Sequence, residues 1–270
     1  MKKILLFMLT LFLATNMYAS DDKIGTYERL GKFVPLDLTF QDENNQTKTL
    51  GEFINNKPTV ISVNYYHCPG ICGPQIDSLT KSLDHLDMKE GKEFNALTIS
   101  FVTSDTPKDA LLFKNNHTRV LNKNFDASAW HFLVTDNNQT RDKLLQSLGY
   151  EYKKIVTKQG FTDYIHPTGL VVISPEGKIT RYLEGIQYLP FDLKMALLES
   201  AKGTVRPTIT RALAFCYSFD PKSSKYVIEY KKIFGVVVSL FLVIIFLYFS
   251  FTSKRNKAKK RNQEGEEINE

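Results

Sequence analysis

Apolar residues follow strand-like and helix-like patterns in turn along most of the chain. The run PTVISVNYY at 58–66 is rich in β-branched and aromatic residues, which is typical of a buried strand. The next segment, 75–86, places Ile76, Leu79 and Leu83 at helical spacing. The pattern therefore predicts a strand followed directly by a helix.

The same alternation continues towards the C-terminus. Further strands are predicted over residues 94–102, 130–135, 169–174 and 179–185, and helices over residues 108–121, 138–150 and 189–203. Pro107 suits the first turn of a helix, and PEGK predicts a hairpin turn between the last two strands. This order predicts an α/β, thioredoxin-like domain with a mostly parallel central sheet flanked by helices. Residues 32–49 should add an N-terminal strand pair.

Two further apolar blocks lie near the ends of the chain and indicate export and anchoring. Lys2 and Lys3 precede an apolar run at 4–14 and the small residue Ala19, which is the layout of a secretory signal peptide. That run is too short to span a bilayer, which needs about 20 residues. The uncharged block at 233–251 would reach about 28 Å as a helix, so it predicts one transmembrane helix.

The basic cluster after the predicted span indicates its orientation. Residues 254–261 read KRNKAKKR, and such a cluster marks the cytoplasmic side of a membrane. We therefore expect a single-pass protein of the cytoplasmic membrane with its globular domain on the periplasmic, extracytoplasmic side. The predicted parts are a signal peptide 1–19, a thioredoxin-like domain 20–205, a juxtamembrane segment 206–232, a transmembrane helix 233–251 and a cytoplasmic tail 252–270.

The composition fits one exported domain and gives little support for nucleic acid as a partner. The chain is 43% hydrophobic and 12% aromatic, which allows an exported stretch of about 210 residues to bury one core. The formal charge is +6, and lysine and arginine are concentrated in the tail, where they would face anionic lipid. We expect membrane lipid as a partner and no nucleic acid.

The motif NYYHCPGICGPQ, residues 64–75, carries the most distinctive chemistry. Cys68 and Cys72 lie where the first predicted strand leads into its helix, and N–H groups at a helix N-terminus stabilise a thiolate. A plain structural disulfide would close only a small loop and would give slight entropic stabilisation. The position is better suited to a redox pair or to half of a metal site.

The third cysteine and most histidines fit ordinary structural roles. Cys216, in the apolar segment ALAFCYSFDP, is expected to be a buried and inert thiol. His85 and His117 fall on predicted helices and should face solvent, whereas His131 begins a strand and should pack in the core. His67 precedes the first cysteine of the motif on a strand, so its side chain should point away from that cysteine.

His166 remains, and its position favours a functional role. It lies in the loop before the strand at 169–174, and in a thioredoxin-like sheet that loop packs beside the cysteine-bearing loop. Two thiolates and one imidazole would select Cu(I) or zinc over hard cations. With three ligands and an exposed rim, Cys68, Cys72 and His166 would suit a metal that must leave again.

Taken together, these segments resemble the Sco/SenC family of membrane-tethered copper-binding proteins. The resemblance rests on YYHCPGIC, WHFLVTD, HPTGLVVISPEGKITRYLEGI and FCYSFDP in that order, and the last of these looks like a bacterial subgroup with a C-terminal anchor. It implies a thioredoxin-like fold that binds copper, as Cu(I) or Cu(II), through Cys68, Cys72 and His166. It also implies a chaperone for cytochrome c oxidase assembly, with the dinuclear copper centre of subunit II or another terminal oxidase as client.

The chain departs from the family pattern near the cysteines. The family commonly has a proline directly after the second cysteine, whereas here Gly73 precedes Pro74. An Asp-Pro pair often follows the second strand in the family, but Val102 and Thr103 stand there, with Asp105 nearby. The acidic contribution of that pair to the copper site or to partner docking is therefore not carried over.

Two other functions fit the same residues. A thiol–disulfide reductant would use the redox-active thiols Cys68 and Cys72 to reduce the client's cysteines and could lose His166, which a copper site could not. A copper or redox sensor would signal without delivering the metal. A peroxidase would need an activating residue set that the sequence does not offer, and we do not expect a conventional enzyme.

Overall fold

The computed structural model describes residues 24–121, 125–157, 160–207, 217–220 and 225–228, with five further positions between 238 and 245. The chain divides into two units, one up to Thr208 and one from Ile209, and each is described by itself. In the second unit, β12 (Tyr217–Asp220) and β13 (Lys225–Ile228) form an antiparallel pair.

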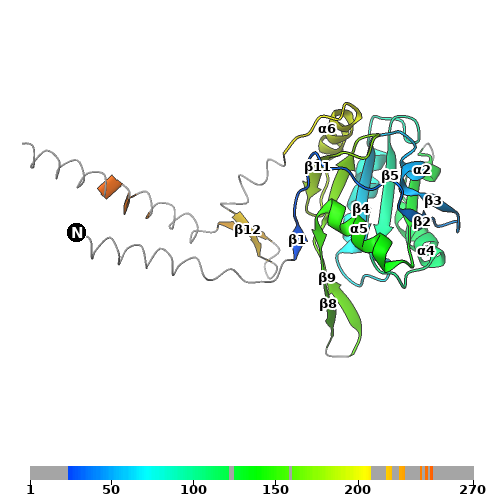
Figure 1. Cartoon of the computed structure of the whole chain (residues 1–270), viewed down its shortest axis with the longest axis horizontal. Helices are drawn as coiled ribbons and strands as arrows, with labels where there is room; N and C mark the ends of the chain where they lie inside the picture. Colours follow the sequence, from blue (N-terminus) through cyan, green and yellow to red (C-terminus); the bar gives the residue numbers. More distant parts are fainter. Residues whose placement is uncertain are drawn as a thin grey trace, which may run out of the picture. The chain divides into compact units, whose positions relative to one another are not determined.

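A five-stranded sheet organises the first unit (Figure 1). Its strands, in the order β11-β10-β4-β5-β6, are β11 (Ile179–Glu184), β10 (Gly169–Ile173), β4 (Thr59–Asn64), β5 (Asn95–Ser100) and β6 (Trp130–Leu133). β4, β5 and β6 are parallel, whereas β10 runs antiparallel to both β4 and β11. The predicted α/β sheet and its closing hairpin are confirmed. Only half of the strand pairings are parallel, because β10 enters the sheet antiparallel to β4 and then pairs with β11 in the closing hairpin.

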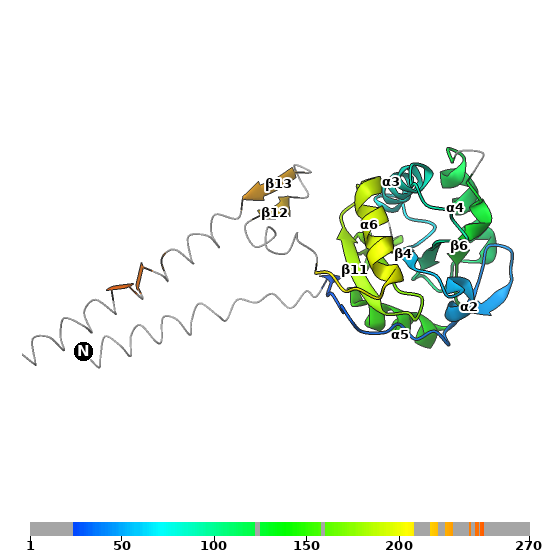
Figure 2. The same ribbon diagram turned by 90° about the horizontal axis from the view of Figure 1, so that it is seen from above.

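Helices cover both faces of this sheet. The four long helices are α3 (Cys72–Asp84), α4 (Pro107–Thr118), α5 (Asn138–Leu148) and α6 (Pro190–Ala201). Figure 2 shows α3 and α5 on opposite sides of the sheet, and α3 packs against both α4 and α6. α4 begins with a capping box between Thr106 and Asp109, and the Asn137 side chain caps α5. The sequence predicted each of these four helices.

Short elements complete the unit. They are β1 (Gly25–Thr26), β2 (Thr39–Gln41), β3 (Thr47–Thr49), α2 (Leu50–Ile54), a 3₁₀ turn (Ala127–Ala129), β7 (Tyr150–Glu151), β8 (Lys153–Val156) and β9 (Thr162–Ile165). The β2–β3 pair confirms the predicted N-terminal hairpin. The β8–β9 hairpin, which projects from the domain in Figure 1, was not predicted. Its strands carry many polar residues, and most of their side chains are at least partly exposed, so the apolar pattern that marks a buried strand is weak there.

The hydrophobic core lies against the middle of the sheet. Every residue of β4 and β5 is buried, as expected for central parallel strands that are covered on both faces. Trp130 and Phe132 of β6 and Ile76 of α3 are fully buried as well. The loop that follows β4 therefore starts from one of the two completely buried strands of the sheet.

The predicted membrane segments fall mostly outside the described residues. Residues 1–23, Cys216 and the tail after 245 are not described, and neither is most of the predicted span at 233–251. Within the part of the chain that the structure describes, no helix has both the length and the apolar character needed to cross a membrane. The signal peptide, the span and the role of Cys216 remain predictions.

Candidate metal centre

The two cysteines of the motif follow β4 at its carboxyl end. The N–H of Cys68 donates to the carbonyl of Tyr65 at 3.3 Å, which turns the chain after the strand. α3 then begins at Cys72, whose side chain is completely buried, whereas Cys68 is partly exposed. Both thiols are free, with Cys68 toward the rim of the site and Cys72 toward the core.

A buried carboxylate holds the start of this loop. Asp105 accepts a hydrogen bond from the N–H of Tyr66 at 2.8 Å and another from the hydroxyl of Ser100 at 2.6 Å. Burial raises the pKa of the Asp105 carboxyl, and the bond from Ser100 opposes that shift. Asp105 does not join the cysteines in a ligand group, so its observed contacts are those of a loop support.

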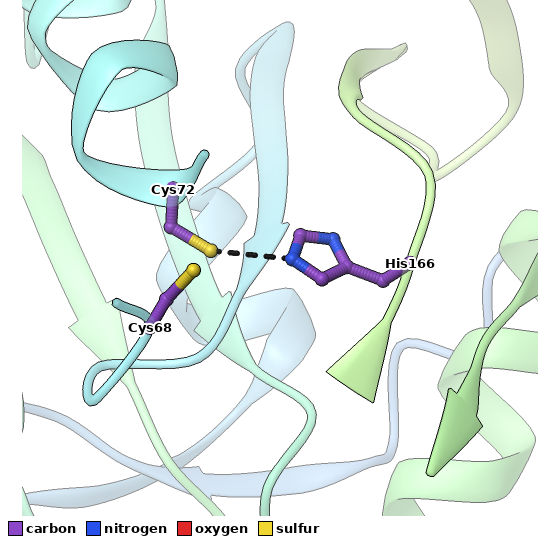
Figure 3. A group of neighbouring side chains, drawn as sticks. All are labelled: Cys68, Cys72 and His166. Carbon is purple, nitrogen blue, oxygen red and sulfur yellow. Dashed lines mark hydrogen bonds between the residues drawn. The ribbon is translucent and has the colours of Figure 1, made fainter. Parts of the chain in front are cut away.

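His166 reaches the cysteines from the far side of the sequence. It lies between β9 and β10, and its Nε2 is 3.4 Å from the Sγ of Cys72, 94 residues away in the chain. The two sulfurs and the imidazole nitrogen all lie within 4.8 Å of one another, and Figure 3 shows the three side chains pointing toward one another. We call Cys68, Cys72 and His166 the thiol cluster. The predicted convergence of these residues is therefore present in the structure.

Aromatic rings and one amide fix the position of the histidine. The His166 ring lies 5.8 Å from the ring of Tyr65, 5.4 Å from Phe101 and 6.4 Å from Tyr150, centroid to centroid. Gln75, in the first turn of α3, donates to the carbonyl of Gly169 at 3.0 Å. That bond ties the helix that carries Cys72 to the strand that follows His166.

The two thiols differ in their proton affinity. A hydrogen bond from the Cys72 thiol, aided by the N–H groups of Cys72 and Gly70, lowers the pKa of Cys68 to about 4. The same pairing with Cys68, together with burial, raises the pKa of Cys72. The helix N-terminus was expected to favour thiolate in general, and the structure places that negative charge on Cys68.

The remaining histidines lie outside the thiol cluster. His67 lies 3.2 Å from Asp109 with an exposed side chain, and it does not join the thiol cluster. His85 is exposed, as predicted. His117 lies 2.7 Å from Asp77 in an exposed contact, and its own side chain is 19% exposed, so the expected solvent-facing position is found only in part.

His131 belongs to a second group of potential ligands. Its Nδ1 lies 3.9 Å from a carboxylate oxygen of Asp42 and equally far from one of Glu43, and the three ligand atoms lie within 4.8 Å of one another. We call these three residues the carboxylate cluster. Lys114 already pairs with Glu43 at 2.5 Å, and the N–H of Phe132 donates to the other oxygen of Glu43 at 2.9 Å. His131 was expected to pack in the core, and it is partly buried against the ring of Phe53.

The fold is an α/β domain in which two free thiols and an imidazole meet at the end of a central strand. This combination is typical of thioredoxin-like proteins that bind a metal or carry out thiol chemistry. The family model described as SCO1/SenC matches residues 31–193. The chain therefore belongs to the SCO1/SenC family. A comparison with curated proteins gives no match.

Solved structures share this fold. A candidate electron transfer protein of Aquifex aeolicus VF5 is 28% identical, with a TM-score of 0.56, over 64% of this chain and 95% of that one. ScoI of Bradyrhizobium japonicum with copper bound is 20% identical, with a TM-score of 0.50, over 63% of this chain and 98% of that one. Arabidopsis thaliana ScoI with copper bound is 14% identical, with a TM-score of 0.50, over 61% of this chain and 96% of that one. These likenesses support the assignment of the fold.

Proposed function

We propose that this protein is a membrane-tethered copper chaperone that delivers copper to a terminal oxidase. The thiol cluster would hold the metal, and the dinuclear copper centre of cytochrome c oxidase subunit II is the client we favour. Membership of the SCO1/SenC family supports this proposal. The single observation that carries it is the convergence of two thiols and one imidazole within 4.8 Å.

The donor set suits copper. Two thiolates and one imidazole are ligands for Cu(I) and, with further donors, for Cu(II), whereas calcium and magnesium require oxygen. Three protein ligands leave a coordination position open, unlike a closed structural zinc site of four. The partly exposed Cys68 gives an incoming ligand access to the metal. The cluster is therefore built for a metal that is bound and then released.

Transfer to the client would proceed by ligand exchange. A thiolate or imidazole of the client would bond to the copper as Cys68 leaves it, because Cys68 lies at the rim and is stable as an unbound thiolate. Cys72 and His166 would follow in the same way. The metal keeps its oxidation state throughout, so the exchange needs no oxidant or reductant.

The membrane tether is proposed from the sequence. Residues 1–19 would direct export, residues 233–251 would span the cytoplasmic membrane, and the basic residues at 254–261 would contact anionic lipid on its cytoplasmic face. The domain at 20–205 would then lie on the extracytoplasmic side. An impermeant thiol reagent added to intact cells or spheroplasts should label Cys68, and protection of Cys68 until the membrane is lysed would contradict this orientation.

A thiol–disulfide reductant is the second candidate, and the low pKa of Cys68 beside a free Cys72 favours it. His166 separates the two functions. Cells that lack the gene should regain oxidase activity with the wild-type chain but not with His166→Ala or Cys68→Ser under copper limitation. A His131→Ala variant is the control and should restore activity fully.

The outcomes distinguish the candidates. Full activity with His166→Ala and none with Cys68→Ser would support the reductant and contradict the copper chaperone. Full oxidase activity after deletion of the gene in copper-replete cells, with altered expression of copper genes, would instead indicate a sensor. Loss of activity with both cluster variants, restored in part by added copper, is the result expected for a chaperone.

A further inference from the structure

The nitrogen of His166 that faces away from the sulfurs has two close partners. Its Nδ1 lies 2.9 Å from the carbonyl oxygen of Pro167 and 2.9 Å from the hydroxyl oxygen of Tyr150. A carbonyl oxygen can only accept a hydrogen bond, so the contact with Pro167 is attractive only when Nδ1 carries the proton. The Nε2 lone pair then faces Cys72, which is the form of neutral imidazole that binds a metal.

The hydroxyl of Tyr150 fits the same tautomer. Tyr150 is 7% exposed, and its hydroxyl donates toward the carbonyl oxygens of Pro167 at 3.1 Å and Val63 at 3.4 Å. Its oxygen is therefore free to accept the Nδ1 proton of His166. The contact with Val63 also joins the histidine loop to β4, the strand that leads into the cysteine loop.

The backbone fixes where this hydroxyl lies. Tyr150 follows Gly149, the C-cap of α5, which has a φ of +64°. A Cβ at Gly149 would lie 1.9 Å from the carbonyl oxygen of Tyr27, so glycine is required for this approach. Tyr150 itself pairs with Thr26 in the β1–β7 ladder. The backbone of Tyr150 is thus anchored by the N-terminal segment, independently of the metal ligands.

We propose that Tyr150 is a positioning residue that holds His166 in the Nδ1–H tautomer and aims Nε2 at the two sulfurs. The part that concerns copper rests on the proposed function, whereas the tautomer is a property of the metal-free chain. Groups that hydrogen-bond to the outer nitrogen of a ligating histidine raise metal affinity by 10–100-fold, so Tyr150 should contribute to that extent.

The test compares Tyr150→Phe with Tyr182→Phe in the full chain in detergent. Tyr182 is a matched control, because it is 2% exposed, donates to Leu148 at 3.0 Å and accepts from the N–H of Arg29 at 2.9 Å. Both variants lose a buried hydroxyl, but only the hydroxyl of Tyr150 contacts His166. Nitrogen-15 NMR of labelled histidine in the metal-free, reduced protein reports the tautomer of His166 directly.

We expect the Nδ1–H form in the wild type and in Tyr182→Phe, and a mixture of tautomers in Tyr150→Phe. Copper(I) affinity, measured by competition with a chromophoric chelator, should fall about 10–100-fold in Tyr150→Phe alone. Unchanged nitrogen shifts and affinity in Tyr150→Phe would overturn the inference, as would an equal loss in both variants. If the wild type binds no copper, the proposed function fails, yet the NMR comparison still decides the role of Tyr150.

Discussion

The thiol cluster and the carboxylate cluster each bring three potential ligands within 4.8 Å. They differ in whether a neighbouring cation already neutralises their negative charge. The carboxylate cluster contains its own cation, because Lys114 pairs with the buried Glu43 at 2.5 Å. Burial lowers the pKa of His131 and so disfavours a positive charge there. In the thiol cluster the negative charge lies on the partly exposed sulfur of Cys68.

This difference shows that convergence alone does not make a metal site. Carboxylate oxygens that accept bonds from an ammonium group and from backbone N–H groups have little capacity left for an ion. Soft sulfur donors with an imidazole lone pair aimed at them keep that capacity. We therefore interpret the carboxylate cluster as a structural ion-pair network and the thiol cluster as the metal centre.

The largest expected effect comes from removing a ligand of the thiol cluster. His166→Ala or Cys72→Ser should lower copper(I) affinity by at least about 1,000-fold, because loss of a direct ligand must exceed the 10–100-fold effect of an outer-shell partner. His131→Ala should leave the affinity unchanged. A chelator competition with the reduced protein measures both. Wild-type copper affinity in His166→Ala would contradict the assignment of the thiol cluster as the metal centre.

The next effect tests the internal cation of the carboxylate cluster. Lys114→Met should lower the free energy of unfolding by about 3 kcal/mol, because it leaves the buried charge of Glu43 without its partner. Lys194→Met is the control: it breaks an exposed pair with Asp87, which should cost less than about 1 kcal/mol. Urea unfolding measures both. An equally small loss in Lys114→Met would mean that the pair does not stabilise the cluster.

The pH dependence of alkylation tests the charge on the thiol cluster. Cys68, with a pKa of about 4, should react with iodoacetamide at nearly the same rate at pH 6 and pH 8, whereas an ordinary thiol speeds up roughly 100-fold over that interval. Cys72→Ala removes the main hydrogen-bond donor, so the pKa of Cys68 should rise and the pH dependence should return. Mass spectrometry locates the label. A roughly tenfold rate increase per pH unit at Cys68 in the wild type would contradict the assigned thiolate.

The smallest effect concerns the helix that carries Lys114. Thr106 caps α4 and forms a capping box with Asp109, so Thr106→Ala should cost about 1 kcal/mol of stability. Copper affinity should stay at the wild-type value, because α4 contributes no ligand to the thiol cluster. Thermal unfolding and the same chelator competition measure the two quantities. If copper affinity fell together with stability in Thr106→Ala, α4 and the thiol cluster would be energetically coupled, which contradicts this prediction.

The main features of the thiol cluster could be predicted from the sequence. Cys68 and Cys72 stand four residues apart at a strand-to-helix junction, and His166 precedes a clear strand. Each of these is a local signal, and the order of strands and helices was enough to place the two loops at one end of the sheet. The assignment of the low pKa to Cys68 needed the contacts between the two thiols, which spacing does not give.

Other features depend on packing between distant segments. The carboxylate cluster forms because the β2–β3 turn lies against β6, where Gln41 and Val134 pair. Tyr150 contacts His166 only because of the turn at Gly149 and the β8–β9 hairpin between the two residues. Asp105 was visible as a nearby acid, but its bond to the N–H of Tyr66 depends on the packing of β4 beside β5. Neither apolar periodicity nor motif spacing records such contacts.

X-ray absorption spectroscopy of the reduced, copper-loaded protein tests the central assignment most directly. It should show two sulfur neighbours near 2.3 Å and one nitrogen neighbour near 2.0 Å, taking the distances typical of zinc as a guide, and His166→Ala should lose the nitrogen. A shell of oxygen and nitrogen without sulfur would contradict copper binding by the thiol cluster, and so would an unchanged nitrogen contribution in His166→Ala.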